Sequence, residues 1–102
     1  MPKLYEYFGL FVLFYSNEHE PIHVHGLDAD GHELKAEIIV VNGKVKTIRF
    51  IKVGNVPPLH GAQLKDFKAL VRVRAEDIVL KWIDFFVFKK QFKMERITKR
   101  VK

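Results

Sequence analysis

The sequence predicts an α+β domain in which a four-stranded antiparallel sheet packs against two helices on one face. Three observations indicate this class. An apolar run at residues 8–15 suits a buried strand, Asn-Gly at 42–43 separates two strand-like segments, and the apolar spacing becomes helical after residue 61. With 102 residues, the chain is expected to form a single domain, residues 1–102.

The first predicted strand is the continuous apolar and aromatic run Phe8–Tyr15. Because this run lacks polar alternation, it is expected to be covered on both faces, at the centre of the sheet. A polar segment ending in Pro21 follows and is predicted to be a loop. Ile22–Leu27 then alternates, so His23 and His25 are predicted to share one face of a second strand.

The third and fourth strands are predicted to form a hairpin. Asp30-Gly31 supplies the turn before the third strand, His32–Val41. Asn42-Gly43 then favours a type I′ turn, because both of its central positions need positive φ. The fourth strand, Lys44–Val53, is therefore antiparallel to the third, and the proline-containing segment Gly54–Gly61 connects the sheet to the helices.

Two helices are predicted in the second half of the chain. An apolar stripe indicates a first helix from Ala62 to about Arg74. A second helix is predicted to begin at Glu76-Asp77, whose carboxylates suit a helix N-terminus. Phe85–Phe88 is either the end of this helix or the start of a strand, and the basic segment Phe92–Val101 is interpreted as a short C-terminal edge strand, the fifth of the sheet.

Composition and charge narrow the classes of function. The absence of Cys excludes disulfides, thiol catalysis and thiolate metal sites. No apolar segment approaches the roughly 20 residues that span a bilayer, and no signal peptide is recognised, so no membrane partner and a cytoplasmic location are expected. Residues 1–33 hold one basic and six acidic residues, whereas residues 34–102 hold seventeen and six. Such a basic half attracts phosphate backbones or an acidic protein partner.

The histidines are the most chemically specific feature. His23 and His25 lie on one strand face with Cβ atoms roughly 6.5–7 Å apart, and His19 in the preceding loop can fold back toward them. Three uses stay open. His19, His23 and His25 can bind zinc or another divalent metal with a water; His23 and His25 can act as a metal-free general base and acid; or the histidines brace the loop through hydrogen bonds.

The metal-free use suits RNA cleavage through the 2′-hydroxyl. That reaction needs two acid–base groups and a cation that contacts the phosphate. Lys35, Lys44 or Lys46, on the predicted hairpin, can supply this cation.

The segment Phe14–His25 resembles the opening of the domain of unknown function 4160 family of small prokaryotic proteins. In that family an aromatic strand is followed by Asn-Asp/Glu-His, a proline and His-x-His. The matching positions are Asn17, His19, Pro21, His23 and His25. The resemblance extends over nearly the whole chain and implies that these five residues form a site, without implying an established activity.

The resemblance also implies a cognate small protein, because many such proteins are encoded beside another small domain in an arrangement suggestive of a toxin–antitoxin pair. The leading expectation is a module that binds a protein partner, nucleic acid or both. The alternative is a histidine-dependent hydrolase, similar to a ribonuclease, that acts with or without a metal, and the sequence leaves open whether the chain is an enzyme. Exposed edge strands also permit a homodimer. Binding residues predicted outside the motif are Lys89, Lys90, Lys93 and Arg96.

Overall fold

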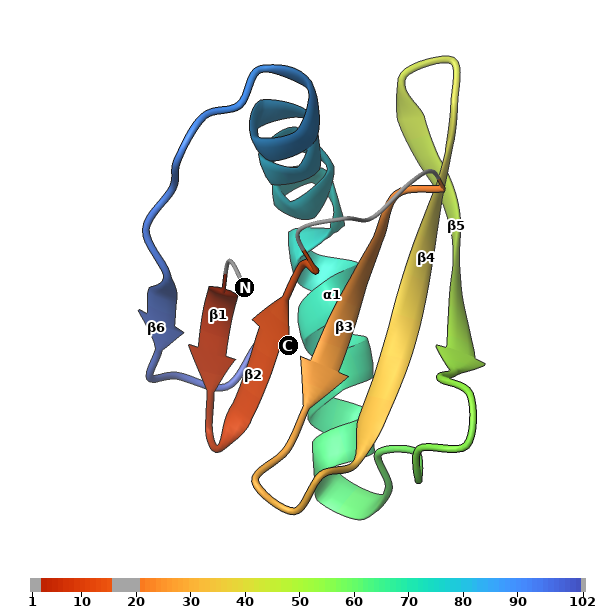
Figure 1. The fold of residues 1–102 in the computed structure, drawn as a ribbon, viewed down its shortest axis with the longest axis vertical. Coiled ribbons are helices and arrows are strands. Elements are labelled where there is room, and N and C mark those ends of the chain that lie inside the picture. Colours follow the sequence, from red (N-terminus) through yellow and green to blue (C-terminus); the bar gives the residue numbers. More distant parts are fainter. Residues whose placement is uncertain (1–2, 16–20, 102) are drawn as a thin grey trace.

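A six-stranded sheet lies against one long helix in the computed structural model, which describes residues 3–15 and 21–101 (Figure 1). The strand order is β5-β4-β3-β2-β1-β6, and only the β1–β6 pair is parallel. The elements are β1 (Lys3–Tyr7), β2 (Leu10–Leu13), β3 (His23–Leu27), β4 (Glu33–Val41), β5 (Lys44–Lys52), the helix α1 (Gly61–Trp82), its continuation η1 (Ile83–Val87) and β6 (Glu95–Ile97). The α+β class is confirmed, whereas the predicted numbers of strands and helices are wrong.

A tight turn occupies the first two residues of the predicted strand Phe8–Tyr15, and the strand before this turn, β1, was not predicted from the sequence. Phe8 and Gly9 have φ values of 49° and 83°, and they join β1 to β2 in an antiparallel hairpin. A phenylalanine at positive φ is uncommon, so a Phe-Gly pair is a weak turn signal. The Phe8 ring is held by an edge contact with Tyr7, at 5.0 Å between centroids, and by the Arg100 guanidinium, 4.0 Å from its centroid.

The predicted hairpin of the third and fourth strands is confirmed. Asn42 and Gly43 have φ values of 53° and 77°, as a type I′ turn requires, and β4 pairs with β5 from Leu34 to Val41, with a register shift between Ile39 and Val40. The segment Ile22–Leu27 also forms the expected strand, β3, which pairs with β4.

One continuous helix replaces the two that were predicted. It runs through Ala75 and Glu76-Asp77 without interruption and continues into η1, so Phe85–Phe88 extends the helix rather than beginning a strand. No glycine or proline occurs between residues 62 and 88 to end a helix. Instead of capping a new helix, Asp77 accepts hydrogen bonds from Lys81, one turn later, and from the Tyr5 hydroxyl.

The core lies between α1 and one face of the sheet. Alternation along β3 directs Val24 and Gly26 toward the helix, where Val24 is fully buried. A Cβ atom on Gly26 would lie 2.5 Å from the Phe67 ring, so glycine is required where the helix comes closest to the strand. The other face of β3 therefore carries His23 and His25, while α1 passes behind the strand (Figure 1).

The last strand, β6, lies at the β1 edge of the sheet. The predicted C-terminal edge strand Phe92–Val101 is confirmed as an edge strand, but only Glu95–Ile97 pairs, and it runs parallel to β1. Strands that pair in parallel need a long crossover connection, and α1 provides it between β5 and β6. The parallel direction of β6 therefore follows from the single helix. No helix in the described part of the chain has the length and apolar character needed to cross a membrane.

Candidate functional site

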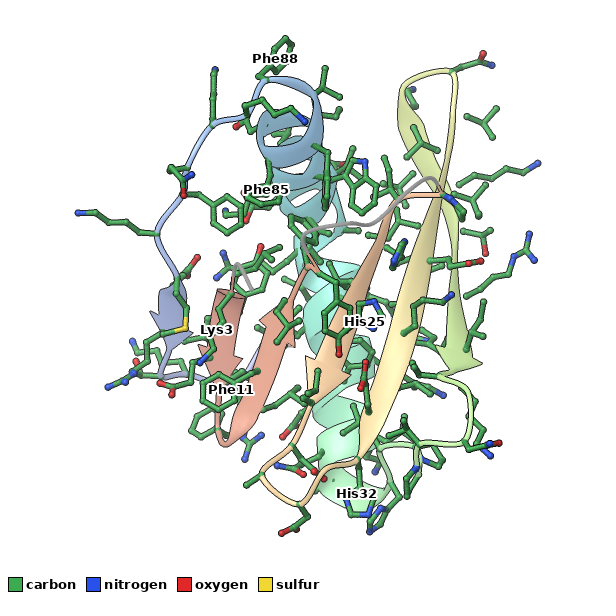
Figure 2. All side chains as sticks on the ribbon, viewed as in Figure 1. Lys3, Phe11, His25, His32, Phe85 and Phe88 are labelled. Atoms are coloured by element: carbon green, nitrogen blue, oxygen red, sulfur yellow. The ribbon has the colours of Figure 1, made fainter. Side chains whose placement is uncertain are left out.

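His23 and His25 project from the same face of β3, opposite to Val24 and Gly26, as the alternation predicted. Figure 2 shows His25 in front of β3 while α1 passes behind the strand. Both side chains are nevertheless buried, since His23 is 6% and His25 5% exposed. Buried imidazoles need hydrogen-bond partners, and those partners determine what each ring can do.

His25 is held by a carboxylate from the neighbouring strand. Its Nδ1 atom lies 2.9 Å from Oε2 of Glu33, which is itself only 7% exposed. The Tyr15 hydroxyl donates to the same oxygen at 2.8 Å, and the Tyr15 ring packs edge-on to His25 at 4.3 Å between centroids. Because a carboxylate only accepts hydrogen bonds, Nδ1 of His25 carries the proton, and in the neutral ring the lone pair is on Nε2.

His23 is held in the same way by a backbone carbonyl. Its Nδ1 atom lies 2.7 Å from the carbonyl oxygen of Pro21, so Nδ1 is again the donor. On its other side the ring contacts Trp82 of α1, at 5.3 Å between centroids. The rings of His23 and His25 then lie 5.2 Å apart at an angle of 74°.

A cation lies beside the histidine pair. Lys35 stands directly opposite His25 in the β3–β4 register, and Glu37 stands opposite His23. The Lys35 ammonium and the Glu37 carboxylate are 3.7 Å apart. Of the three lysines considered for contact with a phosphate, Lys35 is therefore next to the histidines, whereas Lys44 and Lys46 belong to β5, one strand farther away.

The predicted motif is only partly within the described residues. Pro21, His23 and His25 come together, and Pro21 contributes its carbonyl rather than its ring. Asn17 and His19 lie outside the described residues.

Glu33 and Tyr15 are the members of the site that the sequence analysis missed. A signal for Glu33 was present, because the alternation that directs Leu34 and Ala36 inward places Glu33 on the histidine face. The register that pairs Leu27 with Glu33 then sets this carboxylate diagonally across from His25.

Comparison with known proteins identifies the family. The family described as "Domain of unknown function (DUF4160)" matches residues 9–83. The chain belongs to this family. Among curated proteins and among solved structures, nothing matches. The matched range contains His23, His25 and Glu33, together with all of α1, so the histidine site of this DUF4160 protein lies wholly within its family domain.

A second histidine group lies at the turn between β3 and β4. Oδ1 of Asp28 accepts hydrogen bonds from the backbone N–H groups of Asp30 and His32, each at 2.9 Å, and Oδ2 accepts from Nδ1 of His32 at 2.8 Å. The His60 ring lies 4.7 Å from that of His32, which Figure 2 labels at the lower end of the sheet. Three donors thus already occupy the Asp28 carboxylate, which we interpret as the group that closes this turn.

Three of the four C-terminal cations predicted as binding residues contact other residues of the DUF4160 chain. Arg96 forms an ion pair with Glu6. Lys89 donates to the carbonyl of Phe86 at 3.0 Å, and the Lys90 ammonium lies 5.5 Å from the Phe88 ring centroid. Of the four predicted residues, Lys93 alone has no such contact with another described residue.

A different basic surface, not anticipated from the sequence, lies where β5 meets α1. We define the β5–α1 flank as the cations Lys52, Lys65, Lys68 and Arg72 together with the ring of Phe50. The Lys68 ammonium is 5.4 Å and the Arg72 guanidinium 5.5 Å from the Phe50 centroid. Lys65, Lys68 and Arg72 recur at helical spacing on one side of α1, and Lys52 is two residues beyond Phe50 on the same face of β5.

Two of the three acidic residues of α1 are paired away from this flank. The third, Glu76, lies one turn beyond Arg72 and has no ion pair with a described residue. Asp66 pairs with Arg100, and Asp77 pairs with Lys81. On the same side Glu95 of β6 pairs with Arg74 at 3.0 Å. Within residues 3–15 and 21–101, no ion pair involves a cation of the β5–α1 flank.

Proposed function

We propose that this DUF4160 protein binds the phosphate backbone of nucleic acid through the β5–α1 flank. The observation that carries the proposal is the segregation of charge on α1. Asp66 and Asp77 are paired with cations outside the flank, and Glu76 is the one carboxylate of α1 on the flank's side. Lys68 and Arg72 lie over the Phe50 ring, and no cation of the flank has an ion pair with a described carboxylate. A surface of this kind concentrates positive potential and releases counterions when a polyanion binds.

Phe50 sets the character of this contact. Its ring is half-buried and packs edge-on against Phe67 at 5.9 Å, so it supports Lys68 and Arg72 but offers little area for stacking of a base. Because phosphate contacts carry no sequence information, the expected binding is strongly salt-dependent and weakly sequence-dependent.

Fluorescence anisotropy with a labelled single-stranded RNA and a labelled DNA duplex tests the proposal. The double variant Lys68→Gln/Arg72→Gln should weaken binding at 50 mM salt and lower the slope of log K against log salt by roughly one for each phosphate that the variant no longer neutralises. The matched control is Lys90→Gln/Lys93→Gln, which removes the same charge from the C-terminal segment. Equal effects of the two variants, or no salt-dependent binding by the unmodified protein, would contradict the proposal.

Histidine-dependent hydrolysis is a second candidate function, and the Glu33–His25 contact favours it. A carboxylate that accepts from Nδ1 holds the imidazole in one tautomer and strengthens Nε2 as a base. For RNA, Nε2 of His25 takes the proton of the 2′-hydroxyl, and the oxygen bonds to phosphorus. The P–O5′ bond then breaks, and protonated His23 gives its proton to the leaving oxygen.

Expression in a bacterial host and incubation of the purified protein with RNA test this second candidate. Growth arrest or RNA cleavage that is lost in His25→Ala and retained in His60→Ala would support it. A wild-type protein that is harmless and leaves RNA intact would rule it out.

A cognate protein partner, which the family resemblance implied, stays a prediction. Val87 and Phe88, at the end of η1, are 62% and 61% exposed, an apolar character that suits a protein contact. Co-purification from the native host, compared between the wild type and Val87→Ser/Phe88→Ser, tests whether a stable companion depends on these residues.

A further inference from the structure

We propose that His23 and His25 together bind one divalent transition-metal ion, for which Zn²⁺ is the probe, through their Nε2 atoms. The proposal goes beyond nucleic-acid binding, and its test involves no nucleic acid. The two proposals can therefore fail independently. A metal on both Nε2 atoms would, however, exclude the metal-free acid–base use of the same two rings.

The first argument is that each ring presents Nε2 as its ligand atom. Nδ1 of His25 donates to the Glu33 carboxylate, and Nδ1 of His23 donates to the Pro21 carbonyl. A neutral imidazole binds a metal through the nitrogen that lacks the proton. In both rings that nitrogen is Nε2.

The second argument concerns direction along β3. Pro21 precedes the strand, so Nδ1 of His23 is directed toward the beginning of the strand. Glu33 pairs with Leu27 at the end of the strand, so Nδ1 of His25 is directed toward the opposite end. Because the two nitrogens of an imidazole point away from each other across the ring, this arrangement turns the two Nε2 atoms toward the space between the rings.

The third argument is the separation of the rings. Two imidazoles that share one tetrahedral zinc, at Zn–N distances of about 2.0–2.1 Å, have centroids roughly 5 Å apart. The centroids of His23 and His25 are 5.2 Å apart. Their Cβ atoms, on alternate residues of one strand, are farther apart at roughly 6.5–7 Å, so the rings lean toward each other as a shared ligand requires.

The fourth argument is the set of groups behind the rings. Histidines that bind metals nearly always donate their other N–H to a carboxylate or a backbone carbonyl, and these partners fix the ring and strengthen it as a ligand. His25 has the carboxylate, which Tyr15 holds in turn, and His23 has the carbonyl. In the other described histidine pair, only His32 has such a partner, the Asp28 carboxylate, whereas His60 is exposed.

Imidazole ligands suit Zn²⁺, Cu²⁺ and Ni²⁺ rather than Mg²⁺ or Ca²⁺. The two nitrogens that the described residues offer fill two of the four positions of a tetrahedral ion.

Zinc titration of the unmodified protein, followed by long-range ¹H–¹⁵N NMR of the histidine rings, is the decisive experiment. We expect one equivalent of Zn²⁺ to shift the Nε2 resonances of both His23 and His25, while those of His32 and His60 stay in place. An unperturbed His23–His25 pair, or shifts confined to His32 and His60, would overturn the proposal.

Calorimetric titration of variants supplies an independent measurement. His25→Ala should abolish the one-equivalent binding, whereas His60→Ala should leave its affinity within about twofold. Glu33→Gln, which keeps both ligands but removes the carboxylate behind His25, should weaken zinc binding by about 10–100-fold. If His25→Ala is unfolded by circular dichroism, the wild-type NMR titration and the Glu33→Gln affinity still decide the question, and an unchanged affinity in Glu33→Gln would count against the arrangement.

Discussion

Oε2 of Glu33 accepts hydrogen bonds from Nδ1 of His25 at 2.9 Å and from the Tyr15 hydroxyl at 2.8 Å, so one buried oxygen joins three strands. Tyr15 follows β2, His25 lies in β3, and Glu33 begins β4. The contact is at once a structural tie across the sheet and the group that sets the proton position on His25.

Glu33→Gln is expected to destabilise the protein by about 1–3 kcal/mol. His25 and Tyr15 both donate to a buried, charged oxygen of Glu33, and a neutral amide accepts these hydrogen bonds less strongly. Urea unfolding at neutral pH measures this loss. Glu37→Gln is the matched control. Glu37 is two residues beyond Lys35 on the same face of β4, and its half-buried ion pair with Lys35 predicts a loss below about 1 kcal/mol. Similar losses in the two variants would show that the Glu33 hydrogen bonds contribute little.

Gly26→Ala is expected to cost about 1–3 kcal/mol or more, because the added methyl would lie 2.5 Å from the Phe67 ring between β3 and α1. A double-mutant cycle with Phe67→Leu checks the cause. If the clash is responsible, Gly26→Ala should cost less in the Phe67→Leu background than in the wild type. If the losses from Gly26→Ala and Phe67→Leu simply add, the cost of Gly26→Ala arises from the strand backbone rather than from the clash with Phe67.

Asp28 is expected to make stability depend on acid pH. Burial opposes ionisation of its carboxyl, but the hydrogen bonds from the backbone of His32 and Asp30 and from the His32 ring outweigh burial and lower its pKa below the usual value of 3.8. A carboxyl with a lowered folded-state pKa stabilises the fold above its unfolded pKa, and this contribution is lost as pH falls through the folded value.

Asp28→Asn should therefore cost about 0.5–1.5 kcal/mol at pH 7 and clearly less near pH 3, as measured by urea unfolding at both pH values. Asp30→Asn is the control, because the turn uses its backbone N–H rather than its carboxylate. A cost in Asp28→Asn that is the same at both pH values would contradict the assignment.

Glu76→Gly distinguishes one continuous helix from two. Glu76 is exposed and lies in the interior of α1, where glycine is less favourable than an ordinary residue by roughly 0.5–1 kcal/mol. Glu76→Ala should change the free energy of unfolding little. If a helix instead began at Glu76-Asp77, glycine would cost only a few tenths of a kcal/mol at the cap.

Much of the fold was predictable where the signal is local. The Asn42-Gly43 turn and the paired strands around it follow from positive φ and alternation. The shared face of His23 and His25 follows from the two-residue period of a strand. The turn at Phe8-Gly9 was missed because a phenylalanine rarely adopts its φ of 49° without tertiary contacts such as the Arg100 guanidinium over its ring.

The site was predictable only in part, for a related reason. Spacing on one strand revealed the histidine pair, but whether a carboxylate, a carbonyl or a tryptophan holds each ring depends on which residues the other elements bring there. Glu33 arrives through the β3–β4 register, and Trp82 through the packing of α1 on the sheet.

By itself, the sequence determined the α+β class, the β4–β5 hairpin and the single face that His23 and His25 share. The tertiary structure alone decided that the two predicted helices are one, that β6 pairs in parallel with β1, and that α1 has one ion-paired side and one basic flank. The physical reason is how far apart in the sequence the interacting residues lie. Turn φ values and periodicity are properties of neighbouring residues, whereas a contact such as Tyr5 with Asp77 joins positions 72 residues apart and exists only once the sheet and helix are packed.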